Sequence, residues 1–274
     1  MTDSAPHRAA GVLETLEVPK GQLLYVQTSA DWLQRAGLTA AGTMADLLDW
    51  ASPSGTVVMP SYPFHTTHVE YLRQRPTFDV RRTPAAIGLL PESFRRTRGA
   101  VRSPDPDFAV AAIGADAHDI VGTAPAEPDP FGADSSYHRM LARGCTLVGM
   151  GVSLNTTSFI HLIDSRSEAG YPAPVYEQQL FSTTVIDASG AAHPVLRKAI
   201  RPAFQQRIRP SNVNLEMRPS EAVFRSIEIN GACFFTWDLS VWAEWCLAHA
   251  RERAAVRQWP CWLPDFAASA NATA

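Results

Sequence analysis

Two short apolar segments on either side of an amphipathic helix constrain this 274-residue chain most strongly. Leu23–Val26 is apolar throughout and is followed by small polar residues, and the second apolar segment, residues 56–60, ends at Pro60. Between them, residues 44–51 place apolar side chains at helical spacing before a Ser-Pro-Ser-Gly stop. A strand, a helix and a strand within about forty residues form a β-α-β unit, which favours a parallel or mixed sheet.

Similar patterns continue along the chain. Apolar segments predict strands over residues 109–114 and 146–152, and Ser189-Gly190 predicts the turn of a hairpin over residues 181–200. Helices are predicted over residues 85–99, from Ser135 or Ser136, over residues 155–166 with Asn155 or Thr156 as the cap, and over residues 237–256. Residues 61–86 look irregular.

Length and composition narrow the fold class. The length allows one or two domains, and a hydrophobic content of 46% provides a sizeable core and excludes wholesale disorder. We expect residues 1–274 to form a single compact α/β unit, with a mixed, largely parallel sheet flanked by helices. Residues 1–10 and 265–274 are expected to be loose tails.

Charge and cysteine usage argue against several function classes. Lys and Arg number 24 and Asp and Glu number 27, so the formal net charge of −3 argues against nucleic-acid binding. No apolar run is long enough to span a membrane, and the first residues lack the pattern of a signal peptide. The four cysteines form no CxxC pair, so we expect reduced thiols in a cytoplasmic protein.

The best chemical signal lies where the strand over residues 146–152 leads into the next helix. His161 falls within the first two turns of that helix, and Asp164 follows three residues later on the same face. A nearby carboxylate orients an imidazole and raises its basicity, which suits a general base near neutral pH. The alternative is a half-buried histidine that simply pairs with a local acid.

Two kinds of polar cluster indicate anion binding, and each has a structural alternative. Thr28-Ser29 and Ser135-Ser136 follow a strand or precede a helix, where they either present hydroxyls and N–H groups to anions or act as ordinary caps. Four arginines lie close together near residue 99: Arg95, Arg96, Arg98 and Arg102. Their guanidinium groups suit a phosphate site, but they also complement the C-terminus of a helix.

Motifs for metals and nucleotides are weak or missing. His65 and His68 form at most half of a metal site, because no further ligand has suitable spacing, and we predict no metal. The chain has no P-loop, no GxGxxG after its first strand and no GxSxG, which disfavours Walker ATPases, standard dinucleotide enzymes and α/β-hydrolases.

Several ordered segments together resemble the aminoglycoside 3-N-acetyltransferase family. They are GTVVMPSY (55–62), RTPAAIGLLPESFRR (82–96), GAVRSPDP (99–106), DPFGADSSYHRML (129–141) and LVGMGVSLNTTSFIHLID (147–164). The earlier segment YVQTSADWLQRAGL (25–38) resembles the opening strand and loop of the family. The resemblance covers residues 20–168 well and the C-terminal part only loosely.

This resemblance implies an α/β fold in which acetyl-CoA binds in a cleft and its acetyl group passes to an amine of an aminoglycoside or another small metabolite. It implies a role in antibiotic resistance or secondary metabolism. The catalytic histidine of the family falls on His161, Asp164 stands where the family usually has Glu, and Glu92 matches a recurrent acid.

The resemblance also implies binding residues. Thr28 and Ser29 would line the phosphopantetheine or phosphate path. The other residues expected to border the cleft are Arg102, Ser103, Phe131, Gly132, Ser135 and Ser136. Asp105, Asp107 and Tyr62 are expected to contact the substrate, and Asp129 and Asp134 add acidity that suits a polycation.

Two departures from the family pattern concern the cleft. The family's RSxHPxxS is RSPDPDFA here, so Asp105 replaces the histidine and Ala109 replaces the serine. The opening strand has Gln27 where the family has histidine. These changes favour a different amine, different donor contacts, or both.

Other functions remain open at this point. They are acyl transfer in secondary metabolism with a different donor or nucleophile, a non-catalytic binding protein of the same fold, and a metal-dependent hydrolase that uses His65 and His68. The expected partner is a small-molecule amine rather than nucleic acid or a membrane. The seven tryptophans suit either an internal core or a homodimer interface, and a Trp-rich amphipathic helix is more often core.

Overall fold

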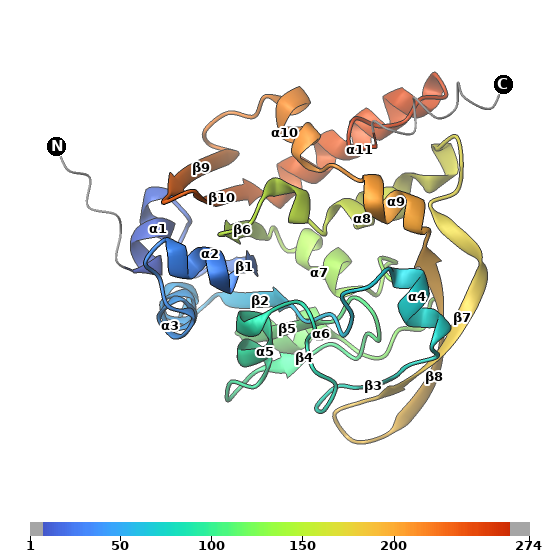
Figure 1. The fold of residues 1–274 in the computed structure, drawn as a ribbon, viewed down its shortest axis with the longest axis horizontal. Helices are drawn as coiled ribbons and strands as arrows, with labels where there is room; N and C mark the ends of the chain where they lie inside the picture. Colours follow the sequence, from blue (N-terminus) through green and yellow to red (C-terminus); the bar gives the residue numbers. More distant parts are fainter. Residues whose placement is uncertain (1–7, 264–274) are drawn as a thin grey trace.

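The computed structural model describes residues 8–263 and centres on a seven-stranded mixed sheet (Figure 1). In spatial order the strands are β4 (Val101–Arg102), β5 (Val110–Gly114), β2 (Thr56–Pro60), β1 (Leu23–Thr28), β6 (Thr146–Met150), β10 (Ala232–Asp238) and β9 (Phe224–Ile229). The mixed α/β sheet is confirmed, but only β2, β1 and β6 run parallel. The outer strands pair antiparallel. For β4–β5 and β9–β10 the connection is too short for the helical crossover that a parallel pair needs.

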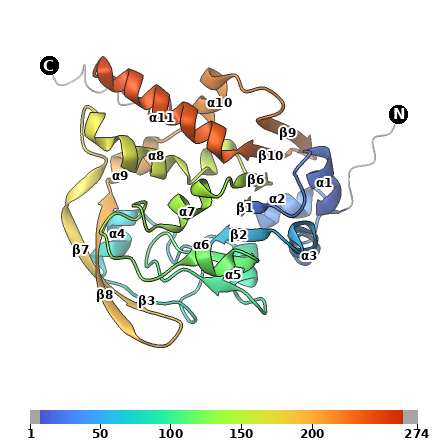
Figure 2. The ribbon, with the colours of Figure 1, turned by 180° about the vertical axis from the view of Figure 1, so that it is seen from behind.

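Alternate residues of the central strands face two separate hydrophobic cores. Leu24 and Val26 belong to one core, and Leu23 and Tyr25 belong to the other. Since side chains alternate along a strand, a strand covered on both faces needs apolar residues throughout, as β1 has. The first core is covered by α1 (Ala9–Thr15), α2 (Ala30–Arg35), α3 (Ala40–Ala51) and α5 (Leu89–Arg95). The second is covered by α6 (Ala117–Val121), α7 (Ser136–Ala142), α8 (Ile160–Ser167) and α11 (Leu239–Ala255), as Figure 2 shows from behind.

A three-stranded sheet forms one side of the same unit. Its strands are β3 (Thr77–Asp79), β7 (Tyr176–Ile186) and β8 (Ala192–Ile200), in the order β3-β7-β8. The predicted hairpin is confirmed, and Gly190 in its turn adopts a φ of +94° that favours glycine. Residues 61–86 are less irregular than predicted, since they contain β3 and α4 (His68–Arg73). A capping box between Thr67 and Glu70 starts this helix, which packs against β8.

Three predicted boundaries are wrong for local reasons. The loose tail expected up to residue 10 already contains the start of α1, where the Ala10 N–H donates to Asp46. The helix predicted over residues 85–99 is only as long as α5, which Gly88 precedes at a φ of +141°. The helix predicted from Asn155 begins only at Ile160, because residues 154–156 form the separate 3₁₀ turn η1 (Leu154–Thr156). The other tail residues, 1–7 and 265–274, lie outside the described residues.

The C-terminal part completes the second core. The predicted long helix is confirmed as α11, and its Trp242 is buried within the same chain. The remaining elements are η2 (Glu168–Gly170), α9 (Pro202–Arg207) and α10 (Ser211–Met217). Among residues 8–263, no helix combines the length and the apolar character that crossing a membrane requires.

Candidate functional site

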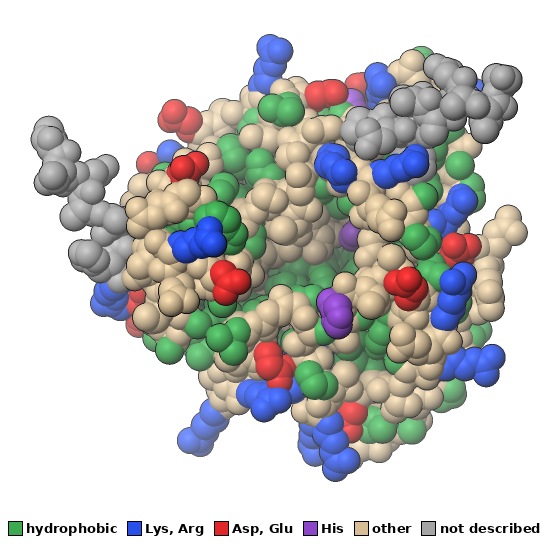
Figure 3. All heavy atoms as spheres, viewed as in Figure 1, with side chains coloured by type: hydrophobic (Ala, Val, Ile, Leu, Met, Phe, Trp, Pro, Cys, Tyr) green, Lys and Arg blue, Asp and Glu red, His purple; other side chains and the backbone are tan. Residues whose placement is uncertain are grey.

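A groove opens at the carboxyl ends of the three parallel strands, the edge where ligands usually bind in such sheets. Two adjoining cavities of about 250 and 290 Å³ form it, and they share Thr28, Ile87 and Pro91. Figure 3 shows this face of the molecule hollowed near its centre, with apolar side chains on the floor of the hollow. Tyr62 lines the first cavity and Ser29 the second, and Thr28 lines both, so these three predicted residues all lie at the groove.

Two polar atoms at this groove have no partner among the described residues. They are the Thr28 hydroxyl oxygen and the Gln27 side-chain oxygen Oε1, and both are buried. A buried polar atom without a hydrogen bond costs free energy, so most such atoms in proteins are paired. The Gln27 amide nitrogen does have partners, since it donates to the Thr156 carbonyl and to the Ser158 hydroxyl. The groove therefore offers polar contacts suited to a ligand that brings its own donors and acceptors.

Three tyrosines meet at the floor of the groove. The Tyr25 hydroxyl lies 3.2 Å from that of Tyr62 and 3.0 Å from that of Tyr137, and the last two hydroxyls also bond to each other. Burial raises the pKa of all three, so they remain protonated donors at neutral pH. Sequence reasoning missed Tyr25 and Tyr137, although a tyrosine within a fully apolar strand is itself a signal, because its hydroxyl needs a partner.

His161 lies in the first turn of α8, where its backbone N–H donates to the carbonyl of Ser158, a residue that lines the groove. Its ring packs between Phe108 and Phe131, whose ring centroids lie 6.0 and 5.7 Å away. The His161 side chain is 14% exposed. Burial, with a contribution from nearby His68, lowers the pKa of His161 to about 4, so its imidazole is neutral at neutral pH.

Asp164 lies close to His161 without a hydrogen bond between them. The distance from His161 Nδ1 to Asp164 Oδ2 is 3.9 Å, and neither atom has a partner among the described residues. The other carboxylate oxygen, Oδ1, accepts hydrogen bonds from the Tyr171 hydroxyl at 3.0 Å and from the Trp262 indole at 2.9 Å. Burial nevertheless raises the pKa of Asp164 to about 7. The carboxyl group is fixed in place and titrates near neutral pH.

A buried charge network fixes the loop that carries Phe108. Arg197 of β8 donates to Asp107 at 2.7 Å and to Asp105 at 3.3 Å, with its side chain fully buried. His68 accepts the Ile200 N–H on Nδ1 at 3.0 Å, so its Nε2 donates to Asp107 at 2.9 Å. Although burial opposes it, Arg197 holds the pKa of Asp107 well below its usual range, whereas burial raises the pKa of Asp105 well above its own.

This network corrects the prediction that Asp107 contacts the substrate, because Asp107 is fully buried against Arg197 and His68. Sequence reasoning missed Arg197. It occupies an inward position of an otherwise ordinary amphipathic strand, and no local pattern reveals that a cation in such a position pairs with a loop some ninety residues away.

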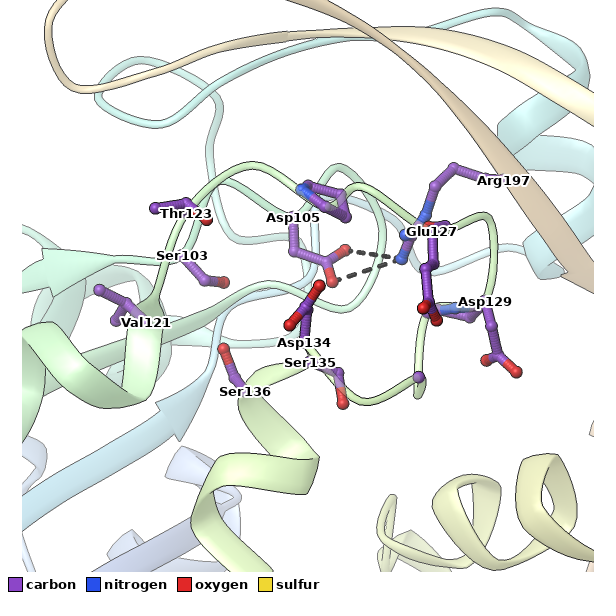
Figure 4. A pocket seen from close by; sticks show the side chains of 13 residues that line it. Ser103, Asp105, Val121, Thr123, Glu127, Asp129, Asp134, Ser135, Ser136 and Arg197 are labelled. Atoms are coloured by element: carbon purple, nitrogen blue, oxygen red, sulfur yellow. Dashed lines mark hydrogen bonds and ion pairs between the residues drawn. The ribbon is translucent and has the colours of Figure 1, made fainter.

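A second, much smaller pocket of about 20 Å³ lies beside this network (Figure 4). Five of the residues predicted to border the cleft or contact the substrate meet there rather than in the groove: Ser103, Asp105, Gly132, Ser135 and Ser136. Ser103 accepts the Val110 N–H, and Ser135 caps α7 by accepting the His138 N–H, so both hydroxyls have structural partners. Glu127, Asp129 and Asp134 complete an acidic wall.

Three further predicted residues have structural partners instead of a place in the groove. Both carboxylate oxygens of Glu92 accept hydrogen bonds from Arg95 or Arg96. Burial opposes ionisation of Glu92, but these ion pairs outweigh it and lower the pKa of Glu92 to about 2. Arg102 donates to the carbonyls of Thr83 and Ser61 and lines a separate cavity of about 920 Å³. Phe131 is 1% exposed and acts by packing. The carboxylate of Glu92 is therefore engaged in ion pairs and does not line the groove.

Two groups of side chains within residues 8–263 bear on metal binding. Both ring nitrogens of His68 already bind protein groups, and His65 is exposed, so the half site suggested by these two residues does not form. Elsewhere, ligand atoms of Glu216, His249 and Cys261 lie within 4.8 Å of one another. His249 Nε2 already accepts the Cys261 N–H, and burial raises the pKa of the Cys261 thiol to about 12.

The fold and the groove define an α/β protein with a groove at the carboxyl edge of its parallel strands, and several solved structures of similar fold are aminoglycoside acetyltransferases. Aminoglycoside acetyltransferase AAC(3)-Xa matches 88% of this chain and 90% of its own with a TM-score of 0.70 and 23% identity. A binary complex of AAC-IIIb with CoASH matches 89% of this chain and 95% of its own with a TM-score of 0.68 and 19% identity.

Sequence comparison names the family. The model of the aminoglycoside 3-N-acetyltransferase family matches residues 25–214, and the chain belongs to this family. Aminoglycoside N(3)-acetyltransferase VIII of Streptomyces fradiae is 37% identical over 92 residues, which are 33% of this chain and 32% of that protein. Aminoglycoside N(3)-acetyltransferase IX of Micromonospora chalcea is 28% identical over 152 residues, or 48% of this chain and 54% of that protein. These matches span about a third to a half of the relatives' length, and the resemblance seen in the motifs is confirmed.

Arg197→Met is expected to destabilise the fold strongly. Removing the guanidinium leaves the Asp107 carboxylate buried without its cation, which costs about 3–5 kcal/mol. Urea denaturation followed by tryptophan fluorescence measures the change. Lys198→Met is the matched control on the same strand, where the loss should stay below about 1 kcal/mol. Equal stability of the two variants would refute the role given to Arg197.

Asp164→Asn tests the raised pKa of Asp164. Between its ordinary value of 3.8 and about 7, the folded chain holds a proton that the unfolded chain has lost, so stability falls as the pH rises through this window. Asn still accepts from Tyr171 and Trp262 but does not titrate. Thermal unfolding from about pH 5 to about pH 8 should therefore depend less on pH in the variant. Asp119→Asn, at an exposed position, is the control; parallel pH profiles for Asp164→Asn and the unmodified chain would contradict the assignment.

Proposed function

We propose that this protein is a CoA-dependent N-acetyltransferase that transfers an acetyl group from a thioester to an amine of an aminoglycoside or a related small polyamine. The observation that carries the proposal is the neutral His161, one turn beyond the groove residue Ser158, with the free oxygen Oδ2 of Asp164 beside its Nδ1. Membership of the family supports it, as does the presence of CoASH in a structure of the same fold.

The groove suits the donor. Thr28 and Ser29 would hold the donor, the unpartnered Thr28 hydroxyl by a hydrogen bond, and the apolar side chains of Ile87 and Pro91 would exclude water from its chain. When bound, acetyl-CoA supplies an activated acetyl thioester. The protonated Tyr62 hydroxyl on the groove wall is suited to donate to the carbonyl oxygen as it gains negative charge.

His161 acts as the general base in this proposal. Its neutral imidazole accepts a proton from the attacking amine while the nitrogen forms the new C–N bond and the C–S bond breaks. The proton then passes to the leaving thiolate, so the products are the amide and the free thiol. Asp164, once ionised, stabilises the transient imidazolium at 3.9 Å. A covalent acyl-enzyme is not needed.

The acidic wall of the small pocket supports a cationic acceptor. Glu127, Asp129 and Asp134 lie together there, and a polycationic amine is attracted to such a concentration of carboxylates. Solved complexes of aminoglycoside acetyltransferase AAC(3)-IVa variants with apramycin and with a gentamicin have the same fold. We infer that the amine acceptor approaches along this wall.

We also propose that the protein acts in the cytoplasm. All four of its cysteines are free thiols in the structure, which suits a reducing compartment. The homodimer stays a prediction that size-exclusion chromatography with light scattering tests.

His161→Ala is expected to lower kcat by about 10²- to 10⁴-fold, because the amine loses its base. Thiol release from acetyl-CoA in the presence of a panel of aminoglycosides and simpler amines measures the rate. His65→Ala, at an exposed histidine, is the control and should keep full activity. An unchanged kcat for His161→Ala would refute the assignment, and a lack of thiol release with every amine would refute acetyl transfer.

Thr28→Val is expected to weaken acetyl-CoA binding by about 2- to 12-fold, the worth of one neutral hydrogen bond of about 0.5–1.5 kcal/mol. Calorimetric titration with acetyl-CoA and with CoA gives the two dissociation constants. Thr156→Val is the matched control, because Thr156 lines the same groove but its hydroxyl already donates to the Ser153 carbonyl. Equal losses in both variants would mean that the Thr28 hydroxyl makes no specific contact.

A further inference from the structure

A cavity of about 920 Å³, larger than either cavity of the groove, lies apart from the groove. It is bounded by the end of α5, by β4 and by the tip of the β7–β8 hairpin, and it shares no lining residue with the two groove cavities. The helix α5 separates them, since Pro91 lines the groove whereas Arg95 and Arg96 line the large cavity. Its volume is typical of sites for small molecules.

The charge of this cavity is strongly positive. Four arginines line it against a single carboxylate, that of Asp187: Arg81, Arg95, Arg96 and Arg102. Asp187 is already engaged by His193 at 2.8 Å and by the Ser189 hydroxyl at 2.6 Å. Outside the cavity lining, the single carboxylate of Glu92 forms ion pairs with both Arg95 and Arg96. Figure 3 shows Lys and Arg side chains gathered along the lower edge of this face.

Arg102 is buried without an ion-pair partner of its own, and the carboxylates of Glu92 and Asp79 act on it only from a distance. It is 7% exposed, and its guanidinium donates to two carbonyls and stacks over Phe78 at 4.5 Å. Its Nε atom has no partner, and within residues 8–263 no carboxylate forms an ion pair with it. Burial and the neighbouring Arg95 lower the pKa of Arg102 to about 9. A buried cation beside a second cation is costly unless an anion offsets it.

The remaining lining mixes polar side chains, such as Thr97, His118 and Thr123, with apolar ones. Val80, Val101, Pro104 and Val121 contribute to the walls, so the cavity can enclose a ring or carbon skeleton as well as an anionic group. Guanidinium forks match the geometry of phosphate oxygens better than other side chains do. Arg95, with a side chain 4% exposed, and Arg102 form the buried end, and the more exposed Arg81 and Arg96 form the rim.

We propose that this cavity binds a phosphorylated small molecule, distinct from the acyl donor, with its phosphate group between the buried and the rim arginines. The site contains Arg95, Arg96 and Arg102 of the basic cluster near residue 99, which line neither the groove nor the acidic pocket. Binding at this site does not depend on acetyl transfer, so the proposal can be tested independently of the proposed activity.

Calorimetric titration of the full chain with inorganic pyrophosphate tests the site. We expect saturable binding that Arg96→Glu weakens by about tenfold or more, because the reversal places a negative charge at the rim. Arg98→Glu is the matched control: Arg98 is exposed two residues later and does not line the cavity, so its effect should stay below about twofold. No saturable binding, or equal losses in the two variants, would overturn the proposal. Arg102 is left intact because it also holds two loop carbonyls.

Competition with the donor identifies the source of the phosphate. Pyrophosphate titrations are repeated in the presence of saturating CoA and of saturating dephospho-CoA. Unchanged pyrophosphate affinity in both supports a separate phosphorylated ligand. Displacement by CoA but not by dephospho-CoA would assign the cavity to the 3′-phosphate of the donor and would overturn the proposal of a distinct molecule.

Discussion

The pairing of Arg197 with Asp107 holds together three parts of the chain that are distant in sequence. Arg197 comes from the hairpin, Asp107 from the loop between β4 and β5, and His68 joins them from α4. Taking these groups out of water is costly, and such a pair is tolerated only where several hydrogen bonds satisfy each charge, as they do here. The loop so fixed presents Phe108 to both His161 and Tyr62. Through this contact the geometry of the site depends on a cation that never touches the groove.

Burial has opposite consequences for the pKa values of His161 and Asp164, the proposed catalytic pair. It disfavours the charged form of each, so it lowers the pKa of His161 to about 4 and raises that of Asp164 to about 7. The imidazole is thereby neutral and able to accept a proton, while the carboxyl group is only partly ionised at neutral pH. The phenol of Tyr171 and the indole of Trp262 both donate to Asp164 Oδ1, which leaves Oδ2 free toward the imidazole. Proton transfer to His161 would favour ionisation of Asp164, so the two titrations are coupled.

Local patterns predicted the parts of the fold that depend on local physics. The apolar segments of β1, β2 and β6, the Ser189-Gly190 turn and the cap at Ser135 are all present, because each follows from periodicity or turn chemistry. The pairing of His161 with Asp164 could be predicted for the same reason, since both lie on one helix. The roles of Arg197 and Tyr137 could not be predicted, because their partners come from other elements. The role of Glu92 was predicted from the resemblance alone, although its spacing to Arg95 and Arg96 on the predicted helix already indicated local ion pairs.

Opposite charges are kept apart over a short distance. The acidic pocket and the basic cavity both contact Val121 and Thr123, so a single turn after α6 separates carboxylates from guanidinium groups. This separation persists because Glu92 and the backbone carbonyls of Ser61 and Thr83 hold the arginines on their own side. A polycation approaching this face is attracted by Glu127, Asp129 and Asp134 and repelled by the arginines, and an anion experiences the reverse. The surface therefore orients two ligands of opposite charge before either makes a specific contact.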